Sequence, residues 1–585
     1  MIRLLAVEGG FDLFLGSRQV VRHRERQPFI TLGEGRASYS MRHGNFRVRD
    51  RITEKYPCRK VEVDEAAGKV TFPGFLEMNV SEEDGRCVLA FRSLQERLDR
   101  CSLAFLVGEE EHFFGGGEQF SYLDLKGKKI PVWVQEQGVG RGFNVVRFAA
   151  DLHSGAGGDF TTTYFPQPTF VSSGGLFLHA ETEAWSLMDF SRRGTFTFSA
   201  HQVPGRIVLG SFPSLAEAVG SLSLYLGRQP DLPEWVYDGM WLGVQGGTEA
   251  VEQKLRDALD AGVKVSALWA QDWEGKRITS FGKQLMWNWE YSAEMYGDLP
   301  GEITGLRERG LRFLGYINPF LAVEGNLYRE AREKGYCVKN ESGEDYLVVV
   351  TTFPAAVLDL TNPEAFSWIK GIIKKNMIGL GLSGWMADFG EYLPTDGVLF
   401  SGEKGERVHN RYPALWAKAN REALEESGKL GEIVFFTRAG YTGTSRYSTA
   451  LWAGDQMANW LRDDGIPSVI PAGLSCGFCG IAYFHSDIGG YTSLGGVRRT
   501  KELFMRWAEM AAFTPIMRSH EGNRPDENWQ FNGDKETLEH LAMMTRTYAG
   551  LKPYHLRNAA EYAERGLPPM RHPAIHYPEE RELYG

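Results

Sequence analysis

The chain has 585 residues, of which 43% are hydrophobic and 12% aromatic, and its formal net charge is −10. A chain of this length is too long for one compact core, so we expect two or more domains. The acidic balance argues against partners that require a basic face, which are nucleic acids and anionic membranes. No apolar run reaches the ~18 residues of a membrane-spanning helix. From the charge and the lack of such a run together, we expect neither a nucleic acid nor a membrane as partner.

The N-terminus and the cysteines bear on the cellular compartment. Residues 1–16 lack the uninterrupted apolar stretch of a secretory signal. Six cysteines in so long a chain do not make a disulfide framework, which predicts a reduced, cytoplasmic protein. Cys476 and Cys479 form a C-x-x-C motif without a second ligand pair at zinc-binding spacing. We interpret them as small residues at the start of a helix.

Residues 1–230 have the pattern of an all-β domain. Their alternating or β-branched runs include 69–75, 87–94, 195–200 and 206–212. Clusters of Gly, Asp and Ser separate these runs, and no long amphipathic helix is evident. This pattern predicts an N-terminal β-sandwich.

From residue 231 to residue 570, apolar strands alternate with amphipathic helices. The strand-like segments are 237–247, 265–273, 312–321, 384–394, 431–440, 449–457, 481–491 and 515–522. The helical segments are 248–262, 364–381, 411–428, 501–513 and 535–565. Eight strands with intervening helices predict a (β/α)8 TIM barrel, and thus a chain of the α/β class.

Almost every predicted barrel strand begins with apolar residues and ends with polar ones. The polar ends are Gln245, Gln271–Asp272, Asn318, Asp388, Arg438, Asp455, His485–Asp487 and Arg518–His520. Because the C-terminal ends of barrel strands converge on one face, these side chains indicate one site. The histidines lie on late strands only, without the tight His/Asp set of a metal site, so we expect no metal. Two carboxylates between aromatic walls favour glycoside hydrolysis.

Five motifs resemble glycoside hydrolase family 31. GWMADFGE (384–391) resembles the family's nucleophile strand, and TRAGYTGTSRYSTALWAGD (437–455) the segment that delivers its acid/base. FHSDIGGY (484–491) and MRSHEG (517–522) resemble two later strands. FFGGGEQF (113–120) resembles a loop of the family's N-terminal sandwich that reaches the site. The motifs follow the family's order and cover roughly residues 110–570.

The resemblance implies a retaining mechanism without a cofactor. Asp388 matches the nucleophile and Asp455 the acid/base, and the pKa of Asp455 should be the raised one. Family members continue into C-terminal β-domains that this chain lacks, so we expect residues 571–585 to be the start of a truncated β region.

Residues 269–289 are similar to the sulfoquinovosidase branch of this family, which hydrolyses α-glycosides of 6-sulfonated glucose. That branch holds the sulfonate with an Arg-x-x-Trp pair and a tyrosine-held water, and it binds sugar hydroxyls with two glutamines. The matching residues here are Trp287, Tyr491, Gln245 and Gln271. The position of the arginine holds Gln284, whose neutral amide cannot replace a charged fork. Arg277 or Lys283 are candidates to compensate.

Further roles follow from the resemblance, each with a structural alternative. Arg438 is expected to contact the nucleophile or the sugar, or to form a structural salt bridge. Asp272 and His520 are expected to hold ring hydroxyls, or to be satisfied barrel polar groups. The remaining assignments are Trp385 and Trp452 as sugar platforms or core, Asp487 as ligand support or barrel structure, and Glu391 as an orienting residue.

Two classes of function stay open. The first is a retaining α-glycosidase acting on a sulfoquinovoside, such as sulfoquinovosyl glycerol from plant sulfolipid, or on a neutral glucoside. The second is a transglycosylase or a sugar-binding relic on the same fold. Asp388 and Asp455 together favour catalysis, whereas Gln284 favours the alternatives. The expected partner is a small-molecule glycoside, and a homo-oligomer is compatible with the sequence.

Overall fold

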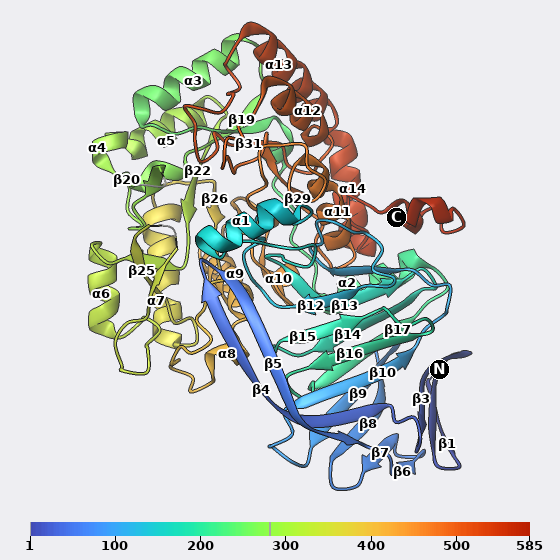
Figure 1. The fold of residues 1–585 in the computed structure, drawn as a ribbon. Coiled ribbons are helices and arrows are strands. Elements are labelled where there is room, and N and C mark those ends of the chain that lie inside the picture. The colour runs from blue at the N-terminus through green and yellow to red at the C-terminus, as the bar shows by residue number, and fades with distance from the viewer. Residues whose placement is uncertain (1, 280–281, 351, 585) are drawn as a thin grey trace.

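The protein is described by a computed structural model that covers residues 2–279, 282–350 and 352–584. It consists of a sheet-rich N-terminal region and a parallel barrel surrounded by helices (Figure 1). Figure 1 shows the N-terminal sheets beside the barrel, with the helix α1 (Asn144–Ser154) lying across the barrel face. The division matches the predicted change of pattern near residue 230.

The N-terminal region contains three antiparallel sheets. The smallest is formed by β1 (Ile2–Val7), β2 (Gly10–Leu15) and β3 (Arg18–Arg24). The second has the order β12 (Lys129–Val132), β15 (Ser186–Asp189), β16 (Thr195–Ala200), β10 (Arg100–Leu106), β4 (Ile30–Arg42) and β5 (Asn45–Pro57). The third has the order β11 (Phe113–Gly117), β13 (Pro166–Ser172), β14 (Leu176–Glu181), β17 (Arg206–Ser211), β9 (Arg86–Ser93), β8 (Leu76–Glu83), β7 (Lys69–Phe72) and β6 (Glu62–Asp64).

The two larger sheets share one hydrophobic core. Leu103 and Phe196 from one sheet and Met78 and Leu209 from the other are buried in it. Their alternation with exposed residues is what the sequence pattern indicated. The region also contains two helices that the sequence analysis missed, α1 and α2 (Leu215–Leu226).

The hairpin of β4 and β5 is long and reaches the barrel (Figure 1). One of its faces packs inward, where Tyr39 stacks on Trp133 with ring centroids 4.9 Å apart. At its tip, the Nδ1 atom of His43 lies 2.9 Å from the carbonyl oxygen of Val350 in the barrel region. The hairpin therefore brings N-terminal residues to the barrel.

The barrel sheet has the order β29-β28-β27-β26-β22-β19-β18-β31-β30, and all its pairs are parallel. Its strands are β18 (Met240–Gly243), β19 (Val265–Trp269), β22 (Arg312–Ile317), β26 (Gly384–Ala387), β27 (Val434–Thr437), β28 (Ala450–Trp452), β29 (Phe484–His485), β30 (Asp487–Ile488) and β31 (Arg518–Ser519). The two ends of this order are pieces of one strand, separated by Ser486, so the sheet closes into an eight-stranded barrel. All eight predicted strand segments are confirmed.

Helices connect and cover the strands. The principal ones are α3 (Thr248–Asp260), α5 (Leu299–Glu308), α7 (Pro363–Ile373), α9 (Tyr412–Glu426), α11 (Ile466–Gly477), α12 (Lys501–Ala511), α13 (Lys535–Gly550) and α14 (Lys552–Arg565). Shorter ones are α4 (Ala293–Tyr296), α6 (Asn326–Lys334), α8 (Gly405–Val408) and α10 (Thr444–Tyr447). A π turn at Lys374–Ile378 extends α7, so the helix predicted at 364–381 is confirmed in two parts.

Two long βα connections carry small sheets of their own. The connection after β19 contains the hairpin of β20 (Lys276–Thr279) and β21 (Gly282–Leu285). The connection after β22 contains β23 (Phe320–Ala322), β24 (Leu347–Val349) and β25 (Pro354–Val357). Both lie at the C-terminal ends of barrel strands, the face on which barrel sites are built.

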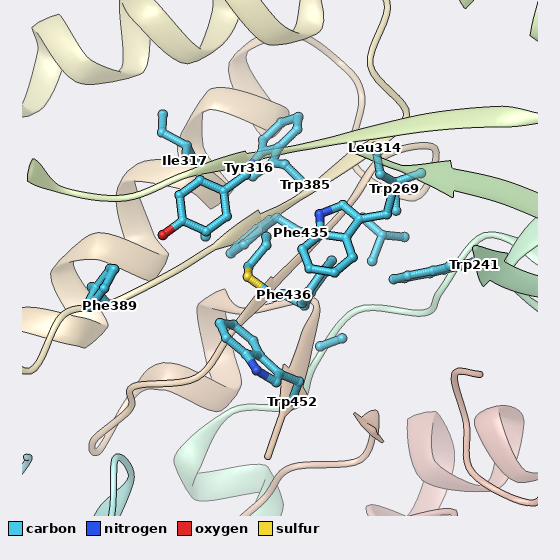
Figure 2. Close-up of a cluster of buried hydrophobic side chains, with 14 of the residues drawn as sticks. Trp241, Trp269, Leu314, Tyr316, Ile317, Trp385, Phe389, Phe435, Phe436 and Trp452 are labelled. Carbon is cyan, nitrogen blue, oxygen red and sulfur yellow. The ribbon is translucent and has the colours of Figure 1, made fainter. Parts of the chain in front are cut away.

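Aromatic side chains fill the barrel interior (Figure 2). Trp241, Trp269 and Trp452 are buried around Phe436, whose ring centroid lies 5.5 Å from that of Trp452. The indole nitrogen of Trp269 donates a hydrogen bond to the carbonyl oxygen of Gly315 at 2.9 Å. Trp452 therefore belongs to the core, one of the two interpretations left open for it.

Two further expectations concern the chain's cysteines and C-terminal segment. Cys476 and Cys479 are buried thiols, but they lie at the end of α11 and not at a helix start. Residues 571–584, expected to begin a β region, form 3-10 turns at Pro573–Ile575 and Arg581–Tyr584. Tyr584 packs its ring against His112 of the N-terminal region. None of the described helices is long and apolar enough to cross a membrane.

Candidate active site

A cavity of about 630 Å³ opens at the C-terminal ends of the barrel strands. Of the predicted site residues, those that line it are Gln245, Gln271, Gln284, Trp287, Asp388, Arg438, Asp455, Tyr491 and His520. These side chains come from many different strands and connections, so part of the constellation predicted from strand ends meets in one cavity, whereas Asn318, His485 and Arg518 do not line it. Asp272 and Trp385 do not line the cavity.

Asp388 follows β26 and is held by donors on both carboxylate oxygens. The Tyr316 hydroxyl donates to Oδ2 at 2.6 Å, and the Phe389 backbone N–H donates to Oδ1 at 2.8 Å. The Asn318 amide in turn donates to the Tyr316 hydroxyl at 3.1 Å. Donors on both oxygens fix the orientation of this carboxylate, which suits a nucleophile.

The backbone next to Asp388 has an uncommon conformation. Phe389 has φ 59° and Trp287 has φ 57°, so both are non-glycine residues in the left-handed region. Their rings pack together at a centroid distance of 5.5 Å. Such conformations carry strain, and they persist where the surrounding packing enforces them, often at functional sites. Here both residues line the cavity, and Phe389 follows Asp388 directly.

Arg438 lies at the centre of a carboxylate cluster. Its Nε atom is 3.1 Å from Asp388 Oδ1, and its Nη1 donates to Asp455 Oδ2 at 3.1 Å. Its Nη2 donates to Glu136 Oε1 at 2.9 Å and also to Glu391. Burial alone would lower the pKa of Arg438, but the carboxylates of Asp388, Glu136 and Glu391 raise it well above its ordinary value. The guanidinium is therefore a fixed cation that bridges both predicted catalytic groups.

The aspartate predicted as acid/base has the raised pKa that this role requires. Burial raises the pKa of Asp455 to about 8, and Asp388 and Glu136 add to the rise against the opposing charge of Arg438. The side chain keeps 31% of its accessible surface, which faces the cavity. An aspartate with such a pKa is protonated near neutral pH and can donate its proton. The predicted direction for Asp455 is confirmed.

Glu391 is fully buried against Arg438 and does not line the cavity. Burial raises its pKa to about 8, with Arg438 opposing. Its position behind the guanidinium fits the expected orienting role.

His520 and Tyr491 form one side of the cavity, and their rings meet edge to face at 4.8 Å. The Nδ1 atom of His520 accepts a hydrogen bond from the Gly522 N–H at 2.8 Å. Burial and the cations Arg518 and Arg499 lower the pKa of His520 well below its ordinary value. The imidazole is therefore neutral with its proton on Nε2, which leaves a donor for a sugar hydroxyl.

Beneath these residues, Asp487 pairs with Arg518, whose Nη2 lies 2.5 Å from Asp487 Oδ1. Arg518 also donates from Nε to the His485 ring at 3.1 Å, and it stacks over Trp269. Asp487 both lines the cavity and anchors this buried network, so the structure combines the two roles left open for it.

The two predicted hydroxyl-binding glutamines lie next to each other. Gln271 Nε2 donates to Gln245 Oε1 at 3.3 Å, and both side chains line the cavity. Asp272 lies behind them, where its oxygens accept from the Gly246 N–H at 2.9 Å and from the Tyr296 hydroxyl. With both oxygens occupied by protein donors, Asp272 anchors the loop after β18 and does not face the sugar.

Trp385 is likewise a core residue. Its indole nitrogen donates to Asn420 of α9 at 2.8 Å, and its ring stacks on Phe435. Successive side chains in a strand point to opposite faces. Met386 and Asp388 therefore face the cavity, while Trp385 points toward the surrounding helices.

Gln284, which stands where the sulfoquinovosidase branch has an arginine, is held by neighbouring side chains. Gln284 Oε1 accepts hydrogen bonds from the hydroxyls of Thr279 at 3.0 Å and Thr352 at 2.7 Å. Arg277, one candidate to compensate, is paired with Glu324, stacks 3.9 Å over the Phe353 ring and does not line the cavity. The side chain of Lys283, the other candidate, lies outside the described residues. Lys276 on β20 does line the cavity.

Cavity residues from the N-terminal region escaped the sequence analysis. They are His43 and Asn45 at the hairpin tip, Glu136, Gln137, Gly138 and Val139 on an irregular segment, His153 and Ser154 at the end of α1, and Ala156 and Tyr164 after it. By contrast, residues 113–120, expected to reach the site, do not line the cavity. The glycine run serves packing there, since a Cβ on Gly117 would lie 2.0 Å from the carbonyl oxygen of Phe165. No local sequence pattern identifies Glu136 as a site residue. Its acidic side chain was the one feature that pointed to a site, and it is a weak one.

The described residues contain no group of three or more His, Cys, Asp or Glu side chains arranged to hold a metal ion. The carboxylates instead converge on Arg438. The arrangement suits acid/base and nucleophilic chemistry by carboxyl groups.

Comparisons with known proteins agree with this geometry. The family model described as the glycosyl hydrolases family 31 TIM-barrel domain matches residues 229–556. A sulfoquinovosidase of Escherichia coli (strain K12) is 46% identical over 98% of this chain and 86% of that protein. A sulfoquinovosidase of Agrobacterium fabrum is 43% identical over 98% of this chain and 87% of that protein.

A solved structure agrees over the whole chain. It is that of a GH31 family sulfoquinovosidase from E. rectale in complex with the aza-sugar inhibitor IFGSQ. It superposes with a TM-score of 0.97 at 43% identity, covering 100% of this chain and 88% of that one. The chain therefore belongs to glycoside hydrolase family 31.

Proposed function

We propose that the protein is a retaining α-glycosidase that hydrolyses α-sulfoquinovosides, with Asp388 as nucleophile and Asp455 as acid/base. The carrying observation is that one guanidinium, Arg438, contacts both carboxyl groups at 3.1 Å. This bridge brings both carboxyl groups to one guanidinium at the cavity, and membership of glycoside hydrolase family 31 supports the retaining outcome. The two relatives named sulfoquinovosidase support the choice of substrate.

The reaction proceeds in two displacements. In the first, an oxygen of Asp388 attacks the anomeric carbon, the glycosidic bond breaks and the leaving oxygen takes the proton of Asp455. In the second, water gives a proton to Asp455 and attacks the anomeric carbon, the ester bond breaks and Asp388 is regenerated as a carboxylate. The sugar is released with its α configuration.

The cavity also offers a cation for the sulfonate. Of the lysine and arginine side chains that line it, Arg438 is paired with carboxylates and Arg524 donates to Glu527 at 3.1 Å. Lys276 has no ion pair within 4 Å to any carboxylate in the described part of the chain. We propose that Lys276 provides the charge that Gln284 lacks, while Trp287 and Tyr491 contact the sulfonated end of the sugar.

The first test is turnover of 4-nitrophenyl α-sulfoquinovoside against 4-nitrophenyl α-glucoside, with Asp388→Asn as the blank. We expect preference for the sulfonated sugar and an initial product in the α configuration by NMR. Lys276→Ala should raise KM for the sulfonated sugar several-fold and leave kcat/KM for the glucoside unchanged, because one charge-assisted contact at the exposed edge of the cavity is lost.

Gln284 favours a second candidate, hydrolysis of a neutral α-glucoside. Preference for the glucoside in the wild type, combined with a gain for the sulfonated sugar in Gln284→Arg, would replace the proposal by this candidate. A β-configured product would refute the retaining mechanism. Binding of either sugar without turnover would assign the protein to the sugar-binding class.

A further inference from the structure

The helix α1 has its apolar side turned toward solvent. Val145, Phe148 and Leu152, at helical spacing, keep 69%, 69% and 75% of their accessible surface. Its charged residues are held by the protein instead, since Arg147 lies 3.4 Å from Asp159 and Asp151 accepts from the Gly157 N–H. A surface helix normally buries its apolar stripe. Contiguous exposed apolar surface marks an interaction site.

Other exposed apolar residues border this helix. Phe143 precedes α1 and keeps 52% of its surface, and Trp460 and Leu461 keep 50% and 46%. The segment that carries Trp460 is tied to the start of α1 because Arg141 donates to the carbonyl oxygen of Asp463 at 2.7 Å. We call the set Phe143, Val145, Phe148, Leu152, Trp460 and Leu461 the apolar patch.

The hairpin of β4 and β5 runs up to the same helix (Figure 1), and it carries a row of arginines. Cross-strand partners share a face, so the register Arg36 with Arg51, Ser38 with Arg49, Ser40 with Arg47 and Arg42 with Asn45 places five arginines on one face. All five are exposed, and the row contains no acidic residue. We call this set the arginine face.

The arginine face is short of acidic partners within the protein. Arg47 lies 3.5 Å from Asp151 of α1, whereas the other four arginines of the face have no ion pair to a described carboxylate. Arg36 and Arg51 stand directly opposite each other, which destabilises a sheet pair. A row of like charges next to an apolar surface is complementary to anionic headgroups above an apolar layer. The expectation that no membrane is a partner rested in part on the net charge of −10, whereas the arginine face concentrates positive charge locally.

The apolar patch and the tip of the arginine face adjoin the cavity. His43 of the hairpin tip, Val139 and His153 near or in α1, and Met457 before Trp460 all line that cavity. We infer that the apolar patch and the arginine face dock the protein on an anionic lipid surface, so that the cavity receives a glycoside whose aglycone is anchored in lipid. The identity of the sugar in this inference rests on the proposed function. The inference adds that the aglycone is a lipid.

The test is cosedimentation of the full-length protein with phosphatidylcholine vesicles, with and without phosphatidylglycerol. We expect binding to the anionic vesicles that weakens with added salt, and about a tenfold loss of affinity in Phe148→Glu/Leu152→Glu. Arg49→Glu/Arg51→Glu should lose binding to a similar degree. The matched control is Phe513→Glu, which changes an equally exposed residue (64%) at the end of α12.

Turnover of soluble 4-nitrophenyl α-sulfoquinovoside is measured for every variant. Unchanged soluble turnover with lost vesicle binding supports the inference, and so does a selective loss of activity on a glycolipid embedded in vesicles. Absence of vesicle binding by the wild type, or equal binding by all variants, overturns it. Dissociation of a wild-type dimer by Phe148→Glu would instead assign the patch to contact between copies. Binding of an oligonucleotide but not of vesicles would assign the arginine face to nucleic acid. Failure of soluble turnover alone would overturn the proposed function and leave the docking result standing.

Discussion

Removal of the charge on Glu136 should shift the pH dependence of catalysis to lower pH. Glu136 and Asp455 accept hydrogen bonds from the two terminal nitrogens of Arg438, at 2.9 and 3.1 Å. Two charges roughly 6 Å apart at an effective dielectric constant of about 20 repel by about 3 kcal/mol, or about 2 pKa units. Water in the open cavity weakens this, so we expect a shift of about 1 unit.

The direction of the shift follows from the role of Asp455. Its pKa of about 8 is raised in part by Glu136, so Glu136→Gln lowers it. Arg438, relieved of one partner, then pairs more strongly with Asp455 and lowers the pKa further. Since Asp455 must be protonated to donate to the leaving oxygen, activity should be lost at lower pH in the variant.

The assay is kcat/KM against pH, which reports the ionisations of the free enzyme. The basic limb should lie near pH 8 in the wild type and near pH 7 in Glu136→Gln. Glu109→Gln, on the exposed surface of the N-terminal region (66%), is the control and should leave the limb in place. A basic limb that stays at pH 8 in Glu136→Gln, or moves upward, would refute the reasoning.

Three further predictions concern the site and its core. Tyr316→Phe removes the 2.6 Å donor to Asp388 and should lower kcat about tenfold or more at little-changed KM, by steady-state kinetics. The Tm of Asp455→Asn relative to that of the wild type should increase as pH rises from about 4 to 8, measured by differential scanning fluorimetry. The wild type loses stability over that interval because the pKa of Asp455 is raised in the folded state, whereas asparagine does not ionise. Equal Tm–pH curves would contradict this. Trp385→Phe should lose about 1–3 kcal/mol of unfolding free energy, because Asn420 is left unpaired in the core, while KM stays within about twofold; a large KM change would return Trp385 to the cavity wall.

The barrel and the meeting of Asp388 and Asp455 at one cavity could be predicted because their signals are local. Each barrel strand is an apolar run with a polar end, and the topology of parallel strands brings those ends together whatever the connections contain. Trp385 could also have been excluded. In a strand with period two, a cavity-facing Asp388 implies that Met386 faces the cavity and Trp385 does not.

The remaining site residues depend on contacts between distant segments. Glu136 reaches Arg438 across 302 positions of the sequence, and His43 reaches Val350 across 307. Neither lies in a periodic segment, so no sequence pattern points to either one. The sequence analysis missed the helix α1 itself, and a helical pattern would still not show which face the protein buries.

Under the proposed function, the N-terminal region contributes to catalysis and is not merely a neighbour of the barrel. The segment that carries Glu136 is fastened on both sides, since the Val134 N–H donates to Asn410 at 2.9 Å and Arg141 pairs with Asp464 at 3.0 Å. Between these anchors, Gln137 donates to the backbone carbonyl of Asp455. The same segment thus fixes the backbone of the acid and supplies a charge that raises its pKa. A barrel without this region would keep both aspartates and lose part of what makes Asp455 a proton donor at neutral pH.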